Sequence, residues 1–167
     1  MSETVTYTYS PWHFVEFRRE SGHMHIWVSL FSSSSDFRRV PLIFDTGAYI
    51  TVLTRMSARR IGLSMTGLYS ANLTGFNRVR GSDKAEIVIA PKIEIGRFIV
   101  EDVQILVPLD DIEVAEVIGE NVFECFSYTV DHDLDRVYFA KNPNPKPYKN
   151  TDSGTDLSCG RVLAQDN

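Results

Sequence analysis

The sequence predicts an all-β fold with one or two short helices. Residues 23–31 alternate apolar and polar side chains around Ile26, Val28 and Leu30, as a strand buried on one face does. Residues 85–109 are rich in β-branched side chains, which favour strands over helices. Glycine and proline recur between such segments and mark the turns that separate consecutive strands. Together these observations indicate a core built from sheets.

The first half of the chain is interpreted as strands followed by a short helix. Residues 11–20 are interpreted as a strand that precedes the one at 23–31, and the apolar segments 39–44 and 49–53 flank a turn. A helix is then expected, in which Thr54 or Ser57 caps the start and Gly62 ends the last turn.

The second half predicts more strands and a second helix. Glycines bound a hairpin expected at 73–83, and the strands within 85–109 are expected to break at Pro91, Gly96 and Pro108. A short helix at 120–126 and a hairpin around 132–135 complete the expected elements, which form a single domain.

Composition excludes several functional classes. The chain has 167 residues, 43% of them hydrophobic and 23% charged, with a formal net charge of −5, as in an ordinary globular protein. This acidic balance gives no reason to expect nucleic acid or an anionic membrane as a partner. No apolar run approaches the ~20 residues that cross a bilayer, and the first residues lack the pattern of a signal peptide.

Cysteine usage indicates a reducing compartment. Of the two cysteines, Cys125 lies in the apolar segment VFECF and is expected to be a buried free thiol, while Cys159 lies in a polar region. We therefore expect a cytoplasmic protein.

One carboxylate stands at an unusual place in the chain. Asp45 follows an apolar strand, and Thr46, Gly47 and Ala48 then form a tight turn before apolar sequence resumes. A strand feeding a turn holds an acid on a rigid element, and glycine permits close approach of the backbone. Burying such an acid without a partner would cost several kcal/mol, so the context favours a function for it.

The segment LIFDTGAYITVL at 42–53 resembles the active-site segment of retropepsin-like aspartic proteases, the single-lobe group of retroviral type. Residues 74–81 resemble the flap of that family, and residues 117–126 resemble its apolar-apolar-glycine strand leading into a helix. Residues 128–139 resemble the closing hairpin of its cellular members.

The resemblance covers residues 22–140, with residues 1–21 before it as an N-terminal segment that carries a strand and residues 141–167 after it as a flexible polar tail. It implies a closed barrel of the acid-protease type that acts as a homodimer on peptide or protein substrates, without a metal or another cofactor. It also implies roles for individual residues: Asp45 as the catalytic acid, Thr46, Gly47 and Ala48 as the active-site turn that holds substrate backbone, Gly75, Phe76, Asn77 and Arg78 as the flap, and Ile118 and Gly119 as the supporting strand–helix motif.

A homodimer would place two Asp45 carboxylates around one water molecule. Two charges ~3 Å apart repel by about 5 kcal/mol at an effective dielectric constant near 20, so such a pair shares a proton. Pepsin-like enzymes usually carry Ser or Thr where this chain has Ala48. Because alanine donates no hydrogen bond to the acid, we expect activity at mildly acidic to near-neutral pH.

The sequence also departs from the retroviral pattern. Tyr49 and Ile50 stand where acidic residues commonly follow the turn, and Glu120 stands where an arginine commonly pairs with them. The flap segment lacks a glycine-rich tip. The alternative function is therefore a retropepsin-like module that binds peptides or associates with itself without cleaving.

Other candidate sites have plainer interpretations. A second Asp-Ser-Gly motif at 152–154 lacks a preceding apolar strand and is followed by too little chain to be catalytic. The acidic residues of 131–135 fit a hairpin turn better than a calcium loop, and His23 with His25 lack further metal ligands. The paired arginines at 18–19, 38–39 and 59–60 fit a solvated surface.

Overall fold

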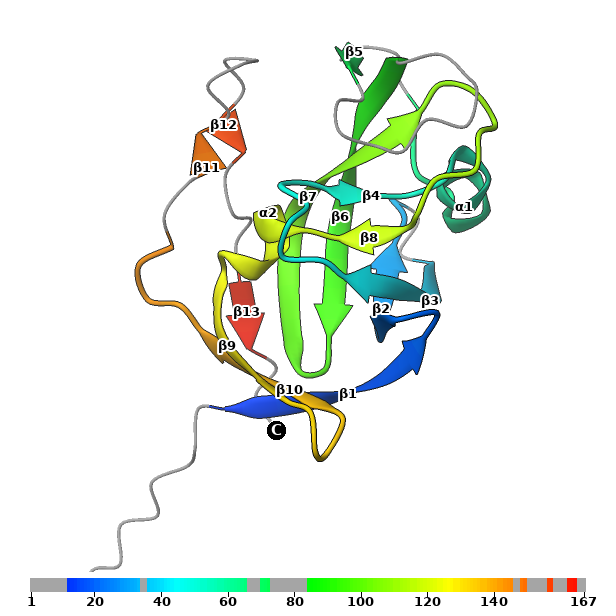
Figure 1. Cartoon of the computed structure of the whole chain (residues 1–167). Coiled ribbons are helices and arrows are strands. Elements are labelled where there is room, and N and C mark those ends of the chain that lie inside the picture. The colour runs from blue at the N-terminus through cyan, green and yellow to red at the C-terminus, as the bar shows by residue number, and fades with distance from the viewer. Residues whose placement is uncertain are drawn as a thin grey trace, which may run out of the picture.

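Strands account for most of the secondary structure in the computed structural model (Figure 1), as the sequence predicts. The structure describes residues 12–33, 36–65, 70–72, 84–145, 148–149, 156–157 and 162–164. The strands are β1 (His13–Glu20), β2 (His23–Phe31), β3 (Phe37–Phe44), β4 (Thr51–Val52), β5 (Ser70–Asn72), β6 (Lys84–Ile95), β7 (Phe98–Pro108), β8 (Val117–Ile118), β9 (Phe126–Asp131), β10 (Arg136–Lys141), β11 (Tyr148–Lys149), β12 (Asp156–Leu157) and β13 (Val162–Ala164). The helices are α1 (Arg55–Ile61) and α2 (Glu120–Phe123).

Six of these strands close into a barrel. They pair in the order β6, β7, β4, β8, β3 and β2, and β2 pairs with β6 to complete the circle. Most neighbours are antiparallel, but β3 with β8 and β4 with β7 are parallel. The predicted all-β closed barrel with short helices is thereby confirmed.

The alternation of apolar residues along the strands explains the core. Ile26, Val28 and Leu30 of β2 all point inward and are at most 1% exposed. They join a cluster that contains inward-facing residues of β6 and β7 and the aromatic side chains of Phe44 and Phe123. The strand predicted at 23–31 is therefore confirmed residue by residue.

A second set of strands lies below the barrel in the view of Figure 1. The first half of β1 pairs with β10 and its second half pairs with β2, so β1 links the barrel to the β9–β10 hairpin. Arg19 fixes the hairpin turn, because its Nε donates to Asp135 Oδ1 at 2.9 Å and its guanidinium donates to the carbonyl of His132 at 2.7 Å. Asp131 Oδ1 accepts from the amides of Asp133 and Leu134. These acids thus have structural roles in a turn, as the hairpin interpretation predicts.

The predicted helix boundaries are also found. Thr54 caps α1 by accepting a hydrogen bond of 3.1 Å from the Ser57 amide. Gly62 ends the helix with a φ of 84°, a left-handed conformation that side chains other than glycine rarely adopt. Glu116 Oε1 accepts from both the amide and the hydroxyl of Thr54, at 3.0 and 2.6 Å, and so ties the cap to the strand region before β8.

Pro91 does not break the sheet, which corrects one expectation. β6 runs through Pro91, and the pairing with β7 continues from Ala90↔Val103 to Lys92↔Glu101 on either side of it. Proline lacks the amide that a ladder bond would need, so the strand continues with one unpaired position. The break expected at Gly96 is found as the turn between β6 and β7.

Part of the segment expected to be a tail belongs to the folded structure. β13 pairs with β7 through Val162↔Val100, and Val162 is buried in the main hydrophobic cluster. The expected flexible polar tail at 141–167 therefore includes one strand, β13, that packs on the barrel, while the domain boundaries themselves stay a prediction.

Cys125 is disulfide-bonded, so the expectation of a free thiol is wrong. The chain has one other cysteine, Cys159, which lies outside the described residues. Neither helix of the described residues is long and apolar enough to cross a membrane.

Candidate active site

The turn that carries Asp45 crosses over the end of a neighbouring strand. β3 and β4 lie on opposite sides of β8, so the chain between them must pass over the end of β8. We call these residues, 45–50, the crossing segment. Backbone hydrogen bonds hold the crossing segment there: the Asp45 amide donates to Ile118 at 3.2 Å, and the Asn121 amide donates to Tyr49 at 3.2 Å. This crossing fixes Asp45 on the barrel.

Gly119 lies directly beneath the crossing. A Cβ atom at this position would come within 2.6 Å of the Ala48 carbonyl oxygen and 2.7 Å of the Ile50 carbonyl carbon. The next amide, that of Glu120, donates to the Ala48 carbonyl at 2.8 Å. Glycine is therefore required here because two backbone segments touch. The structure places the predicted supporting pair, Ile118 and Gly119, against the predicted turn.

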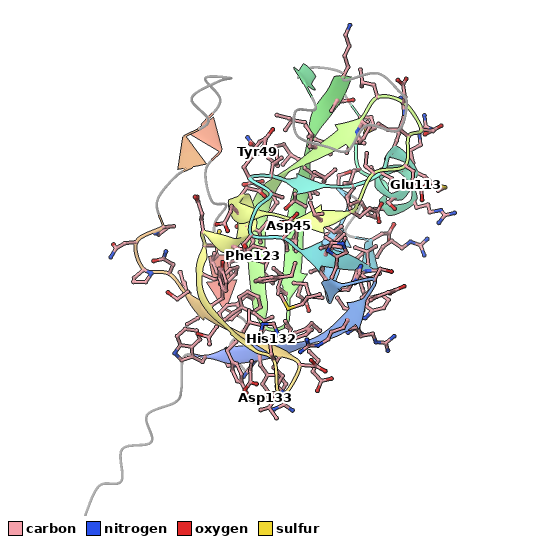
Figure 2. All side chains as sticks on the ribbon, viewed as in Figure 1. Asp45, Tyr49, Glu113, Phe123, His132 and Asp133 are labelled. Atoms are coloured by element: carbon pink, nitrogen blue, oxygen red, sulfur yellow. The ribbon has the colours of Figure 1, made fainter. Side chains whose placement is uncertain are left out.

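The Asp45 side chain is held in place by its own turn. Its Oδ1 accepts a hydrogen bond of 2.9 Å from the Gly47 amide, and its carbonyl accepts one of 3.3 Å from the Ala48 amide. Asp45 is half-buried, whereas Thr46 and Gly47 are exposed. Figure 2 shows Asp45 above Phe123 near the centre of the molecule, with Tyr49 further along the same turn. The arrangement leaves one carboxylate at an accessible surface with a fixed orientation.

An apolar surface adjoins this turn. A second hydrophobic cluster, separate from the main core, is formed by β4, β6, β7, β8 and the residue before β4. Its buried members are Ile50, Val52, Ala85, Leu106 and Val117, and the half-buried side chains packed on it are Ile43, Ala48, Tyr49, Ile87, Ile112 and Val114. Two of these half-buried residues, Ala48 and Tyr49, belong to the segment that carries Asp45, so the apolar cluster reaches the turn.

Glu120 is an acidic residue next to the turn, since its amide donates to the Ala48 carbonyl. Burial raises the pKa of the Glu120 carboxyl above its ordinary value. Burial also raises the pKa of the Tyr128 hydroxyl, and the negative charge of Glu120 raises it further. An acid therefore stands close to the turn, at the position where the retroviral pattern has a cation.

Sequence reasoning did not identify Thr51 and Asn121. Both are buried, and Asn121 Oδ1 accepts from the Thr51 amide at 2.8 Å and from the Thr51 hydroxyl at 3.0 Å. The available signal was the presence of polar residues in two mainly apolar segments, YITVL and VIGENVF. That signal gives no partner, because 70 residues separate the two in sequence.

Two predicted features lie outside the described residues. These are the flap residues Gly75, Phe76, Asn77 and Arg78 and the Asp-Ser-Gly motif at 152–154. The structure does describe strands on either side of the flap segment, where β5 pairs with β6 from Ser70↔Glu86 to Asn72↔Lys84. Within the described ranges, no three His, Cys, Asp or Glu side chains gather as metal ligands would.

Comparisons with known proteins agree with this geometry. The family model described as "gag-polyprotein putative aspartyl protease" matches residues 36–124, which is more than half of the chain. The crystal structure of a retropepsin-like aspartic protease from Rickettsia conorii is similar, with a TM-score of 0.56 and 20% sequence identity over 78% of this chain and 90% of that one. No curated protein matches the chain.

The family match spans β3, the Asp45 turn, β4, β8 and α2, and the similar crystal structure shares the barrel. The chain therefore belongs to the gag-polyprotein aspartyl protease family and has the retropepsin-like fold.

Proposed function

We propose that the protein is an aspartic endopeptidase that works as a homodimer, with the two Asp45 carboxylates on either side of one water molecule. The observation that carries the proposal is the position of Asp45, on a turn that backbone hydrogen bonds join to Ile118 and Glu120, with its carboxylate held by the Gly47 amide. Within the described residues, this crossing carries one acid, so a two-carboxylate site needs a second copy of the chain.

The reaction follows from two acids that share one proton. The ionised Asp45 removes a proton from water, the water oxygen bonds to the carbonyl carbon of the peptide, and the protonated Asp45 of the partner gives its proton to the carbonyl oxygen. The carbon–nitrogen bond then breaks as Asp45 gives the nitrogen the proton that it took from water. The partner's carboxylate takes a proton from a hydroxyl of the tetrahedral intermediate, which becomes the product carboxyl group, and the pair returns to its starting state. The hydrogen bond from the Gly47 amide holds the Asp45 carboxylate in one orientation during this cycle.

The turn also supplies a means of binding an extended peptide. The amides of Gly47 and Ala48 and the carbonyl of Ala48 already have partners within the chain. We propose that the exposed Gly47 carbonyl accepts a hydrogen bond from the substrate backbone, with Thr46 joining the two turns across the dimer. Substrate strands would lie on the apolar surface beside Asp45, which favours apolar residues next to the cleaved bond.

The flap proposal extends from the described strands. β5 and β6 form an antiparallel pair on either side of the segment that contains Gly75, Phe76, Asn77 and Arg78. A hairpin that continues this pair would close over a bound peptide.

A cytoplasmic location remains a prediction, and it loses the support of a free thiol because Cys125 is disulfide-bonded.

The experiment is cleavage of a peptide library by the wild-type protein and by Asp45→Asn, at several values between pH 4 and pH 7. We expect the wild type to cut and Asp45→Asn, which preserves the shape of the turn, to leave the library intact. Equal cleavage by both proteins would reject Asp45 as the catalytic acid. Peptide binding by both without cleavage would instead establish the non-catalytic binding module.

A further inference from the structure

Thr51 and Asn121 form a buried polar network directly behind the Asp45 turn. Thr51 is 0% exposed and Asn121 is 3% exposed, and most of the other buried side chains of the described residues are hydrophobic. The Thr51 hydroxyl donates to Asn121 Oδ1 at 3.0 Å and accepts from the Gly119 amide at 3.2 Å. The Asn121 amide group donates to the Gln104 carbonyl at 2.8 Å. Each side-chain group of the pair therefore has a partner.

The network joins the three segments that define the crossing. Thr51 begins β4 and so fixes the point where the turn ends. Gly119 lies beneath the turn, and Asn121, two residues later, receives the Thr51 amide and reaches β7 through Gln104. The backbone amide of Asn121 also donates to Tyr49, within the crossing segment itself.

Packing alone does not require polar residues at these places. A buried hydroxyl and a buried amide are costly unless all their hydrogen bonds form, and an apolar pair of similar volume avoids that cost. What a fully satisfied polar network adds is a single geometry, since the bonds form only at one spacing and orientation. The segment held in this way is the one that presents Asp45.

We propose that Thr51 and Asn121 are positioning residues, which hold the crossing segment so that Asp45 faces its counterpart at the distance and angle that proton sharing needs. The proposal rests on the proposed peptidase function. Loss of either side chain would leave the barrel intact but would let the crossing segment shift relative to β8. A misplacement near 1 Å can cost about 100-fold in rate.

The test compares Thr51→Val, which removes the hydroxyl at nearly constant volume, with Thr51→Ser, which restores it. We expect Thr51→Val to lower kcat about 10- to 100-fold with KM changed less than about twofold, and Thr51→Ser to recover most of kcat. Thr51→Ala is the second variant, because it removes the hydroxyl without placing a methyl group against the Gly119 amide.

The matched control is Glu116→Gln. Glu116 Oε1 also accepts hydrogen bonds from the hydroxyl and the amide of one threonine, Thr54, but these two bonds hold the start of α1 and not the crossing segment. We expect Glu116→Gln to lower the melting temperature while leaving kcat within about twofold of wild type. If Thr51→Val lowers kcat no more than Glu116→Gln at a similar loss of stability, the positioning role is rejected.

A readout without catalysis separates this proposal from the peptidase proposal. In an Asp45→Asn background, we would follow hydrogen exchange of the Glu120 and Asn121 amides, which donate across the crossing to the carbonyls of Ala48 and Tyr49. Thr51→Val should speed their exchange about tenfold or more relative to amides of β2, and Glu116→Gln should not. Unchanged exchange in Thr51→Val would overturn the proposal even if the enzyme is active. Faster exchange in a protein that cuts no peptide would uphold the role of Thr51 and reject the peptidase function alone.

Discussion

The rings of Phe44 and Phe123 pack with their centroids 4.2 Å apart, and Phe44 immediately precedes Asp45, the candidate catalytic acid. Phe44 is the last residue of β3, and Phe123 is the last residue of α2. Phe123 also stacks near Phe139 of β10, with centroids 6.4 Å apart. The main core thus reaches from the barrel to the hairpin through this contact, and Asp45 stands on its edge.

Phe123→Ala should strongly destabilise the fold. Phe123 is fully buried, and removing such a ring costs about 3–5 kcal/mol in the free energy of unfolding. Phe123→Leu should cost less, because more of the volume remains. Urea denaturation of the two variants and the wild type measures both values. A loss below about 1 kcal/mol for Phe123→Ala would show that the ring contact with Phe44 does not support β3.

Gly119→Ala should damage the site more than its size suggests. The added methyl group would lie 2.6 Å from the Ala48 carbonyl oxygen, and backbone must move to relieve the contact. Overpacking of this kind costs about 1–3 kcal/mol, and the movement would displace the turn that carries Asp45. Denaturation and peptide cleavage measure the two effects.

Ser127→Ala provides the control for that substitution, because Ser127 is exposed on β9. It should change stability by no more than about 0.5 kcal/mol. Wild-type cleavage by Gly119→Ala would show that the close approach of the two backbones is dispensable.

Glu120→Gln should increase stability at neutral pH. Because burial raises the pKa of the folded-state Glu120 carboxyl, the folded protein binds this proton more tightly than the unfolded chain. The wild type therefore loses stability as the pH rises from about 4.5, through the raised pKa, and glutamine cannot ionise. Calorimetry should show a higher melting temperature for Glu120→Gln at pH 7 and a smaller difference at pH 4. A wild type that becomes more stable than the variant as the pH rises would contradict the sign.

Cleavage should depend on association of two chains. If each chain supplies one acid, the rate per chain falls on dilution below the dissociation constant of the dimer. Adding a large excess of Asp45→Asn should also inhibit, because most wild-type chains then pair with a partner that lacks the acid. An unrelated acidic protein at the same excess is the control. A rate per chain that is independent of both concentration and added variant would indicate a complete site within one chain.

Local patterns predicted most of the elements. The alternation at 23–31 was sufficient to predict β2, and the cap residues Thr54 and Gly62 were sufficient to predict the ends of α1. Both signals depend only on residues that are close together in the sequence. The crossing segment was likewise visible as a strand, a turn and a strand around Asp45. Pro91 was misjudged because proline can occupy an unpaired ladder position, which depends on the neighbouring strand.

Contacts between distant residues were the part that the sequence could not supply. Thr51 and Asn121, or Thr54 and Glu116, are ordinary polar residues until folding brings them together. The same is true of β13, whose three residues form a strand only because β7 offers them an edge, and of Cys125, whose disulfide does not follow from its apolar neighbours.

The separation of the two Asp45 carboxylates in a crystal structure of the assembled protein, grown with a non-cleavable peptide, tests the central claim most directly. The account predicts two turns related by a two-fold axis, with carboxylate oxygens about 3 Å apart and one water or the scissile group of the ligand between them. Carboxylates too far apart to share a ligand atom in every assembly, with the peptide bound elsewhere, would contradict it.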